Sequence, residues 1–119
     1  MRIIFVEDNG YLRETMAEML EGSDREIVAC ETAEEALAQF ERRPADVVIT
    51  DVSLPGMSGI DLARRVIERV PGTWVIVSSG YAFDRGLESL GPTVRSLPKP
   101  FEIDAMDALL DEIRRARGG

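Results

Sequence analysis

Short apolar runs alternate with amphipathic helical patterns along the whole of this chain, and no other feature of the sequence constrains its fold as strongly. Runs of this length, bounded by turn residues, are typical of buried strands in a parallel sheet. Strands that alternate with helices predict an α/β fold in which helices cover both faces of the sheet. The five expected strands are Arg2 to Val6, Glu26 to Cys30, Asp46 to Asp51, Trp74 to Val77 and Thr93 to Leu97.

The length of 119 residues suits one such unit, so we expect a single domain over residues 1–119. At this size the expected architecture is a (βα)5 doubly wound parallel five-stranded sheet with the strand order 2-1-3-4-5. That order places the first strand beside the third.

Capping residues mark where the helices begin. Asn9 is the expected cap of the first helix, Thr32-Ala33-Glu34-Glu35 matches a capping box, and Ser58 precedes the third helix. The segment from Phe83 to Leu90 is a poor helix because Gly86 interrupts it.

Helical spacing predicts that the first helix buries Leu12, Met16, Met19 and Leu20. The third helix is expected to bury Leu62, Ala63, Val66, Ile67 and Val70.

The balance of charges is acidic, with 14 basic against 22 acidic residues and a net charge of −8. Nucleic acids and anionic membranes attract basic side chains, so we expect neither as a direct partner. The first apolar run meets Glu7 and Asp8 after four residues, and no signal-peptide pattern or long apolar stretch is present, which predicts a cytoplasmic protein. The single cysteine, Cys30, is expected to be a small buried hydrophobic residue.

Histidine is absent from the sequence. Its absence excludes Ser-His-Asp and Cys-His catalysis and removes the usual imidazole ligands of zinc. Any chemistry therefore depends on carboxylates, hydroxyls, lysine and a hard cation.

Polar side chains follow four of the expected strands, at the edge where sites form in open parallel sheets: Glu7 and Asp8, Asp51, Ser79 and Lys99. Each of these residues alone is most simply a solvated loop residue. Three neighbouring carboxylates repel one another, however, so either one is protonated or a cation lies between them, and oxygen ligands favour Mg²⁺. A neutralised Asp51 can act as a nucleophile toward a phosphoryl group, with Lys99 and the Ser79 hydroxyl holding phosphoryl oxygens.

Four segments of the chain, in this order, resemble the receiver domains of bacterial two-component response regulators, which have a flavodoxin-like fold. The segments are Val6-Glu7-Asp8-Asn9, Thr50-Asp51-Val52-Ser53-Leu54-Pro55-Gly56-Met57-Ser58-Gly59, Ser79-Gly80-Tyr81 and Lys99-Pro100-Phe101. The resemblance covers the whole chain and implies that Asp51 is the phosphoacceptor, Ser79 the switch hydroxyl and Lys99 the phosphate-binding lysine. It also implies a cis Lys99-Pro100 bond. The Mg²⁺ ligands that it implies are Glu7 (through a water), Asp8, Asp51 and the backbone carbonyl of Ser53.

The resemblance further implies that a histidine kinase or a histidine phosphotransferase donates the phosphoryl group. The chain's own chemistry would be limited to self-phosphorylation from a donor and slow autodephosphorylation. Phosphorylation is expected to switch the surface formed by Phe83 to Leu90, the strand Thr93 to Leu97 and the last helix, where a downstream protein binds. Since the sequence starts on the first strand and ends just past the last helix, we expect a stand-alone receiver or the N-terminal piece of a longer regulator.

One position departs from the family pattern. Many receivers have Tyr or Phe three residues before the lysine, where this chain has Ser96. Tyr81 is either a gate to the phosphoryl group or a surface aromatic without that role. The weak helix propensity of Phe83 to Leu90 favours a switch in which phosphorylation orders or shifts this segment. The form Ser79-Gly80-Tyr81-Ala82 is similar to receivers that are attached to hybrid kinases or act alone.

Two other functions are alternatives. A receiver-like interaction module would bind partners without phosphorylation, but such modules usually lack an acidic residue, the switch hydroxyl or the lysine, and this chain has them all. A Mg²⁺-dependent phosphohydrolase resembling the haloacid dehalogenases would have a second aspartate two residues after the nucleophile, where this chain has Ser53. The phosphoacceptor receiver is therefore the favoured function.

Overall fold

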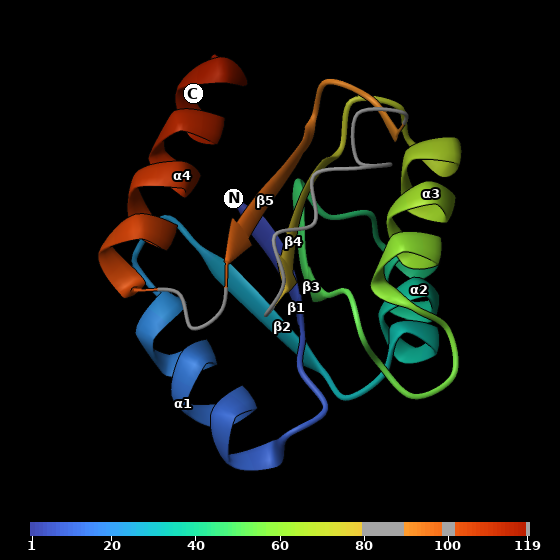
Figure 1. Cartoon of the computed structure of the whole chain (residues 1–119). Helices are drawn as coiled ribbons and strands as arrows, with labels where there is room; N and C mark the ends of the chain where they lie inside the picture. The colour runs from blue at the N-terminus through green and yellow to red at the C-terminus, as the bar shows by residue number, and fades with distance from the viewer. Residues whose placement is uncertain (80–89, 99–101, 119) are drawn as a thin grey trace.

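The computed structural model describes residues 1–79, 90–98 and 102–118. In this part of the chain, five parallel strands form one sheet with the order β2-β1-β3-β4-β5, which confirms the predicted topology (Figure 1). The strands are β1 (Arg2–Val6), β2 (Glu26–Cys30), β3 (Val47–Asp51), β4 (Trp74–Ser79) and β5 (Val94–Pro98). The described helices are α1 (Gly10–Leu20), α2 (Ala33–Arg42), α3 (Gly59–Arg69) and α4 (Ile103–Ala116). The predicted helical segment after β4 lies almost wholly outside the described residues.

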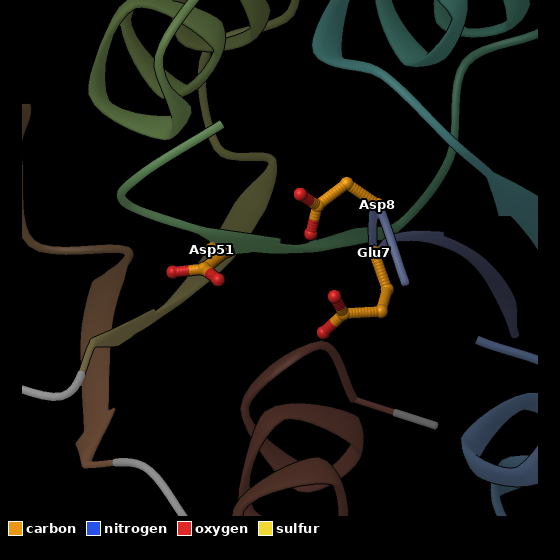
Figure 2. A group of neighbouring side chains, drawn as sticks. All are labelled: Glu7, Asp8 and Asp51. Atoms are coloured by element: carbon orange, nitrogen blue, oxygen red, sulfur yellow. The ribbon is translucent and has the colours of Figure 1, made fainter. Parts of the chain in front are cut away.

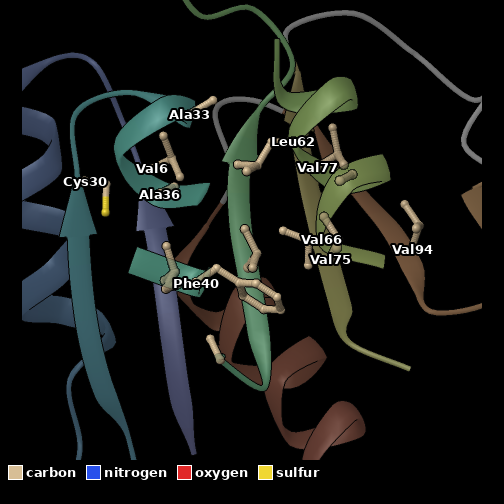
Figure 3. Close-up of a cluster of buried hydrophobic side chains, with 14 residues drawn as sticks. Val6, Cys30, Ala33, Ala36, Phe40, Leu62, Val66, Val75, Val77 and Val94 are labelled. Atoms are coloured by element: carbon tan, nitrogen blue, oxygen red, sulfur yellow. The ribbon is translucent and has the colours of Figure 1, made fainter. Parts of the chain in front are cut away.

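The sheet is covered on both faces, and the alternation of side chains along each strand explains how. On β1, Ile3 and Phe5 join a buried cluster that includes Met106 of α4 and Leu20 of α1. The intervening residues Ile4 and Val6 point to the opposite face. They join a second cluster, which includes Phe40 of α2 and Leu62 of α3 (Figure 3). β1, which is apolar from Ile3 to Val6, is thus buried on both sides, with α1 and α4 over one face and α2 and α3 over the other (Figure 1).

The three predicted helix caps are confirmed. The side chain of Asn9 accepts a hydrogen bond from Leu12 N at 3.0 Å, and Thr32 Oγ1 accepts one from Glu35 N at 3.0 Å. Ser58 Oγ accepts one from Asp61 N at 3.1 Å. Each cap satisfies a backbone donor that has no partner within its helix, and so fixes the residue at which the chain turns from strand end to helix.

Two of the predicted helix faces are partly wrong. Within α1 the fully buried residue is Leu20, while 38% of Leu12 and 47% of Met19 are exposed. Met16 packs against the core beside Leu20, so the buried face of α1 is turned away from Leu12 and Met19, which lie at its margin. Val70 is also exposed, because α3 ends at Arg69 and Val70 lies in the turn that follows.

No helix in the described ranges is long and apolar enough to cross a membrane.

Candidate functional site

Three carboxylates converge where β1 and β3 end side by side. Glu7 and Asp8 directly follow β1, and Asp51 is the last residue of β3. Each residue offers an oxygen, and these oxygens all lie within 4.8 Å of one another. Figure 2 shows that the three side chains come from these two neighbouring strand ends. The strand order 2-1-3 brings together acids that are more than forty residues apart in the sequence.

The three carboxylates differ in exposure, and the backbone holds two of them in place. Glu7 is buried, and its Oε2 accepts a hydrogen bond from Asn9 N at 3.1 Å. Asp51 is half-buried, and its Oδ1 accepts one from Ser53 N at 3.3 Å. Asp8 is exposed. The cluster therefore opens to solvent on the side of Asp8 and is closed on the side of Glu7.

The main chain of Asp51 is fixed from both sides. Thr50 Oγ1 donates a hydrogen bond to the Asp51 carbonyl oxygen at 3.1 Å. Gly59, the first residue of α3, lies so close that an added Cβ would overlap that oxygen and stand 2.8 Å from the Asp51 carbonyl carbon. This role of Gly59 is not among those predicted from the sequence. Its signal was a glycine at the first position of a helix, a residue type that helices otherwise disfavour.

Ser78 is a second neighbour of Asp51 that the sequence analysis missed. It pairs with Asp51 across β3 and β4 and is only 2% exposed. Within the described part of the chain, its Oγ is a buried side-chain atom that has no hydrogen-bond partner. A buried hydroxyl without a hydrogen-bond partner is uncommon and lowers the free energy of unfolding. Ser78 is therefore expected to destabilise the fold next to Asp51.

The other predicted site residues are placed in part. Ser53 is exposed in the loop that follows β3, and Ser79 ends β4, on the neighbouring strand to Asp51. Ser96 is exposed on β5, in register with Val77. Lys99 and Tyr81 lie outside the described residues. The structure thus places the three acids together and leaves the contributions of Ser79, Lys99 and Tyr81 as predictions.

Cys30 is buried beside the site, as predicted. Its backbone carbonyl accepts a hydrogen bond from Glu7 N at 3.0 Å, and its side chain is 1% exposed. Burial, with a smaller contribution from the negative charge of Glu35, raises the pKa of the thiol to about 12. The thiol is therefore protonated at neutral pH and inert as a nucleophile.

The donor set at the cluster is that of a hard cation. Three carboxylates supply oxygen ligands and no imidazole is present in the sequence. Mg²⁺ takes one or two carboxylates and keeps several waters, which agrees with a cluster that is open to solvent at Asp8. The residues present therefore fit Mg²⁺.

The sequence model of the response regulator receiver domain family matches residues 3–111. Response regulator protein FleR of Pseudomonas aeruginosa is 36% identical over 96% of this chain and 24% of its own length. DNA-binding transcriptional regulator NtrC of Klebsiella pneumoniae is 29% identical over 89% of this chain and 23% of its own length. The chain thus spans about a quarter of the length of these curated relatives. A response regulator receiver domain protein from Clostridium thermocellum has the same fold, with a TM-score of 0.87, 22% identity and coverage of 98% of this chain and 96% of that one.

Proposed function

The chain belongs to the response regulator receiver domain family, and on that basis we propose that residues 1–119 form one phosphoacceptor receiver domain with Asp51 as its phosphorylation site. The observation that carries this proposal is the convergence of Asp51 with Glu7 and Asp8 at one edge of the sheet. A half-buried carboxylate at a strand end, beside two further acids, combines a nucleophile with a cation site.

We assign the cation as Mg²⁺, held by Asp8, Asp51, the backbone carbonyl of Ser53 and, through a water, Glu7. When bound, Mg²⁺ supplies positive charge to the oxygens of a phosphoryl group and offsets the repulsion between the carboxylates. The backbone donors at Asn9 and Ser53 orient two of these carboxylates before any cation arrives. Such outer hydrogen bonds hold ligands in the orientation that binding needs.

The proposed donor is a phosphohistidine on a partner histidine kinase or histidine phosphotransferase. An Asp51 carboxylate oxygen attacks phosphorus, an O–P bond forms, and the P–N bond to the imidazole breaks. The imidazole leaves with the bonding electron pair and takes up a proton. Lys99 and the Ser79 hydroxyl are proposed to bind phosphoryl oxygens as these transfer. Hydrolysis of the resulting aspartyl phosphate returns the free carboxylate and inorganic phosphate.

The proposed output is a change in the surface around the segment that follows β4, together with β5 and α4, where a downstream protein binds. Ser96, exposed on β5, offers no aromatic ring for that change, so we assign the switch to an ordering or shift of the segment Phe83 to Leu90. We further propose a cytoplasmic location, because the net charge of −8 disfavours binding to anionic membranes.

Intact mass after incubation with acetyl phosphate and Mg²⁺ tests this function. The parent protein is expected to gain one phosphoryl group, and the gain should disappear when Mg²⁺ is omitted or Asp51 is replaced by Ala. Asp104→Ala is the matched control, because Asp104 is an exposed acid in the first turn of α4. Asp104→Ala should be phosphorylated like the parent. A parent protein that gains no Asp51-dependent mass would instead favour the interaction module that works without phosphorylation.

A further inference from the structure

The loop 52–58 joins the end of β3 to α3 and contains Ser53, whose carbonyl is a proposed Mg²⁺ ligand. The side chain of Glu34, on helix α2, makes a hydrogen bond to this loop. We propose that Glu34 is a positioning residue of the cation site: it holds the loop at Met57 and thereby the Ser53 carbonyl. This inference rests on the proposed function, because it names a residue that supports the same site.

Hydrogen bonds within the segment itself tie down the two ends of the loop. At its start, Ser53 N donates to Asp51 Oδ1 at 3.3 Å. At its end, Gly59 N donates to Val52 O at 3.1 Å. These two bonds fix where the loop leaves β3 and where it enters α3, but neither reaches the residues between.

The loop is also held from outside, by the packing of Leu54 and Met57 on the core and by a hydrogen bond at Met57. Glu34 Oε2 accepts a hydrogen bond from Met57 N at 3.1 Å, across 23 residues of sequence. Without this carboxylate the Met57 N–H would have to find water. Because α2 is packed on the sheet through Ala33, Ala36 and Phe40, Glu34 connects the loop to a rigid element.

The Glu34 carboxylate lies close to Gly56, where a larger residue would collide with it. Its φ of 78° is a left-handed conformation that suits glycine. An added Cβ at Gly56 would also lie 2.5 Å from Glu34 Oε2, so a side chain there would push the carboxylate off the Met57 N–H. The backbone conformation favours glycine at the residue next to Met57, and the absence of a side chain there leaves the Glu34 carboxylate room to reach the Met57 N–H.

The contact acts on the geometry of the loop more than on the stability of the fold. Glu34 is exposed, and a hydrogen bond at an exposed position contributes little to the free energy of unfolding. An outer contact that orients a metal ligand has a larger effect on metal affinity, commonly tenfold or more. Loss of Glu34 should therefore weaken Mg²⁺ binding while the protein still folds.

Calorimetric titration with Mg²⁺ and hydrogen exchange of the Met57 amide together test the inference. Glu34→Ala removes the acceptor, and we expect about tenfold weaker Mg²⁺ binding and faster exchange of the Met57 amide in the Mg²⁺-free protein. Glu34→Gln keeps an oxygen acceptor without the charge and should restore both properties. Restoration by Gln separates positioning from a direct effect of the Glu34 charge on the cation.

Glu35→Ala is the matched control. Glu35 lies in the same first turn of α2, and its Oε2 also accepts a backbone hydrogen bond, but from Glu31 N at 3.2 Å and not from the loop 52–58. Its loss should leave Mg²⁺ affinity and Met57 exchange unchanged. Equal Mg²⁺ binding by the parent and Glu34→Ala would overturn the inference alone, as would equal weakening in Glu34→Ala and Glu34→Gln. Failure of the parent to bind Mg²⁺ would overturn the proposed function and, with it, this inference.

Discussion

Gly59 packs directly against the main chain of Asp51, and the contact leaves no room for a side chain at the start of α3. The carbonyl oxygen of Asp51 also accepts a hydrogen bond from Thr50 Oγ1 at 3.1 Å. The first residue of α3 therefore sets how closely the helix approaches the end of β3. The position of the proposed nucleophile depends on a residue that carries no functional group of its own.

Gly59→Ala should lower the free energy of unfolding by roughly 3 kcal/mol, because either β3 or α3 has to move to admit the methyl group. The shift should also slow phosphorylation of Asp51. Denaturant unfolding and intact mass after acetyl phosphate treatment measure the two effects. Gly10→Ala is the control, since Gly10 likewise begins a helix but, within the described ranges, its added Cβ would meet only the Arg13 side chain, at 3.5 Å. If the two variants were equally stable, the packing at Gly59 would not be the tight contact described above.

Ser78→Ala should raise the free energy of unfolding by about 1 kcal/mol, because it removes a buried hydroxyl that has no partner in the described structure. Thr73→Val is the comparison. Thr73 is also buried, but its Oγ1 donates to the Val70 carbonyl at 2.8 Å, so its loss should lower stability by about the same amount. Chemical denaturation of the parent and both variants without Mg²⁺ shows whether each substitution raises or lowers the free energy of unfolding. A Ser78→Ala variant less stable than the parent would show that the hydroxyl has found a partner.

The Cys30 thiol should make stability depend on pH in the alkaline range. Its pKa is raised from 9.0 to about 12 in the folded protein, so below pH 9 the thiol is protonated in both states and contributes no pH dependence. Between pH 9 and 12 the unfolded chain loses the proton while the folded chain keeps it. The free energy of unfolding should then fall by about 1.4 kcal/mol per pH unit from this group.

Unfolding curves of the parent and Cys30→Ala from pH 8 to 10.5 isolate this contribution, because other groups titrate equally in both proteins. The stability difference between the two proteins should shift steadily in favour of the variant above pH 9. Parallel pH profiles would mean that the thiol titrates normally in the fold.

Mg²⁺ should stabilise the folded protein, because the carboxylate cluster forms only when β1 and β3 come together. At a Mg²⁺ concentration one hundred times the Kd, the expected gain is about 2.7 kcal/mol. Asp8→Asn removes one carboxylate and should weaken binding at least about tenfold, which lowers the gain at the same Mg²⁺ concentration by about 1.4 kcal/mol. Melting curves with and without Mg²⁺ measure the gain, with Asp104→Asn as a control that should respond like the parent. Equal responses of all three proteins would place the cation elsewhere.

The architecture and the acidic cluster were both predictable from the sequence. The alternation of apolar runs and helical patterns is a local signal, and caps such as Asn9, Thr32 and Ser58 act within one turn. The strand order 2-1-3-4-5 is the leading choice for a doubly wound sheet of this size, and it brings Asp51 beside Glu7 without any knowledge of side-chain packing. The exposure of Leu12 and Met19 was not predictable, because helical spacing defines an apolar stripe but not the part of it that faces the sheet.

The sequence by itself determined which strands form, which faces they bury and which acids follow them, because these properties depend on residues close together in the chain. Only the tertiary structure decided that Gly59 packs on Asp51, that Glu34 reaches Met57 and that Ser78, beside the proposed nucleophile, is buried with no hydrogen-bond partner among the described residues. Those relationships join atoms from different elements at van der Waals or hydrogen-bond distance. Contacts of that kind depend on the distance between each helix and the sheet. That distance depends on the packing of all the core side chains together.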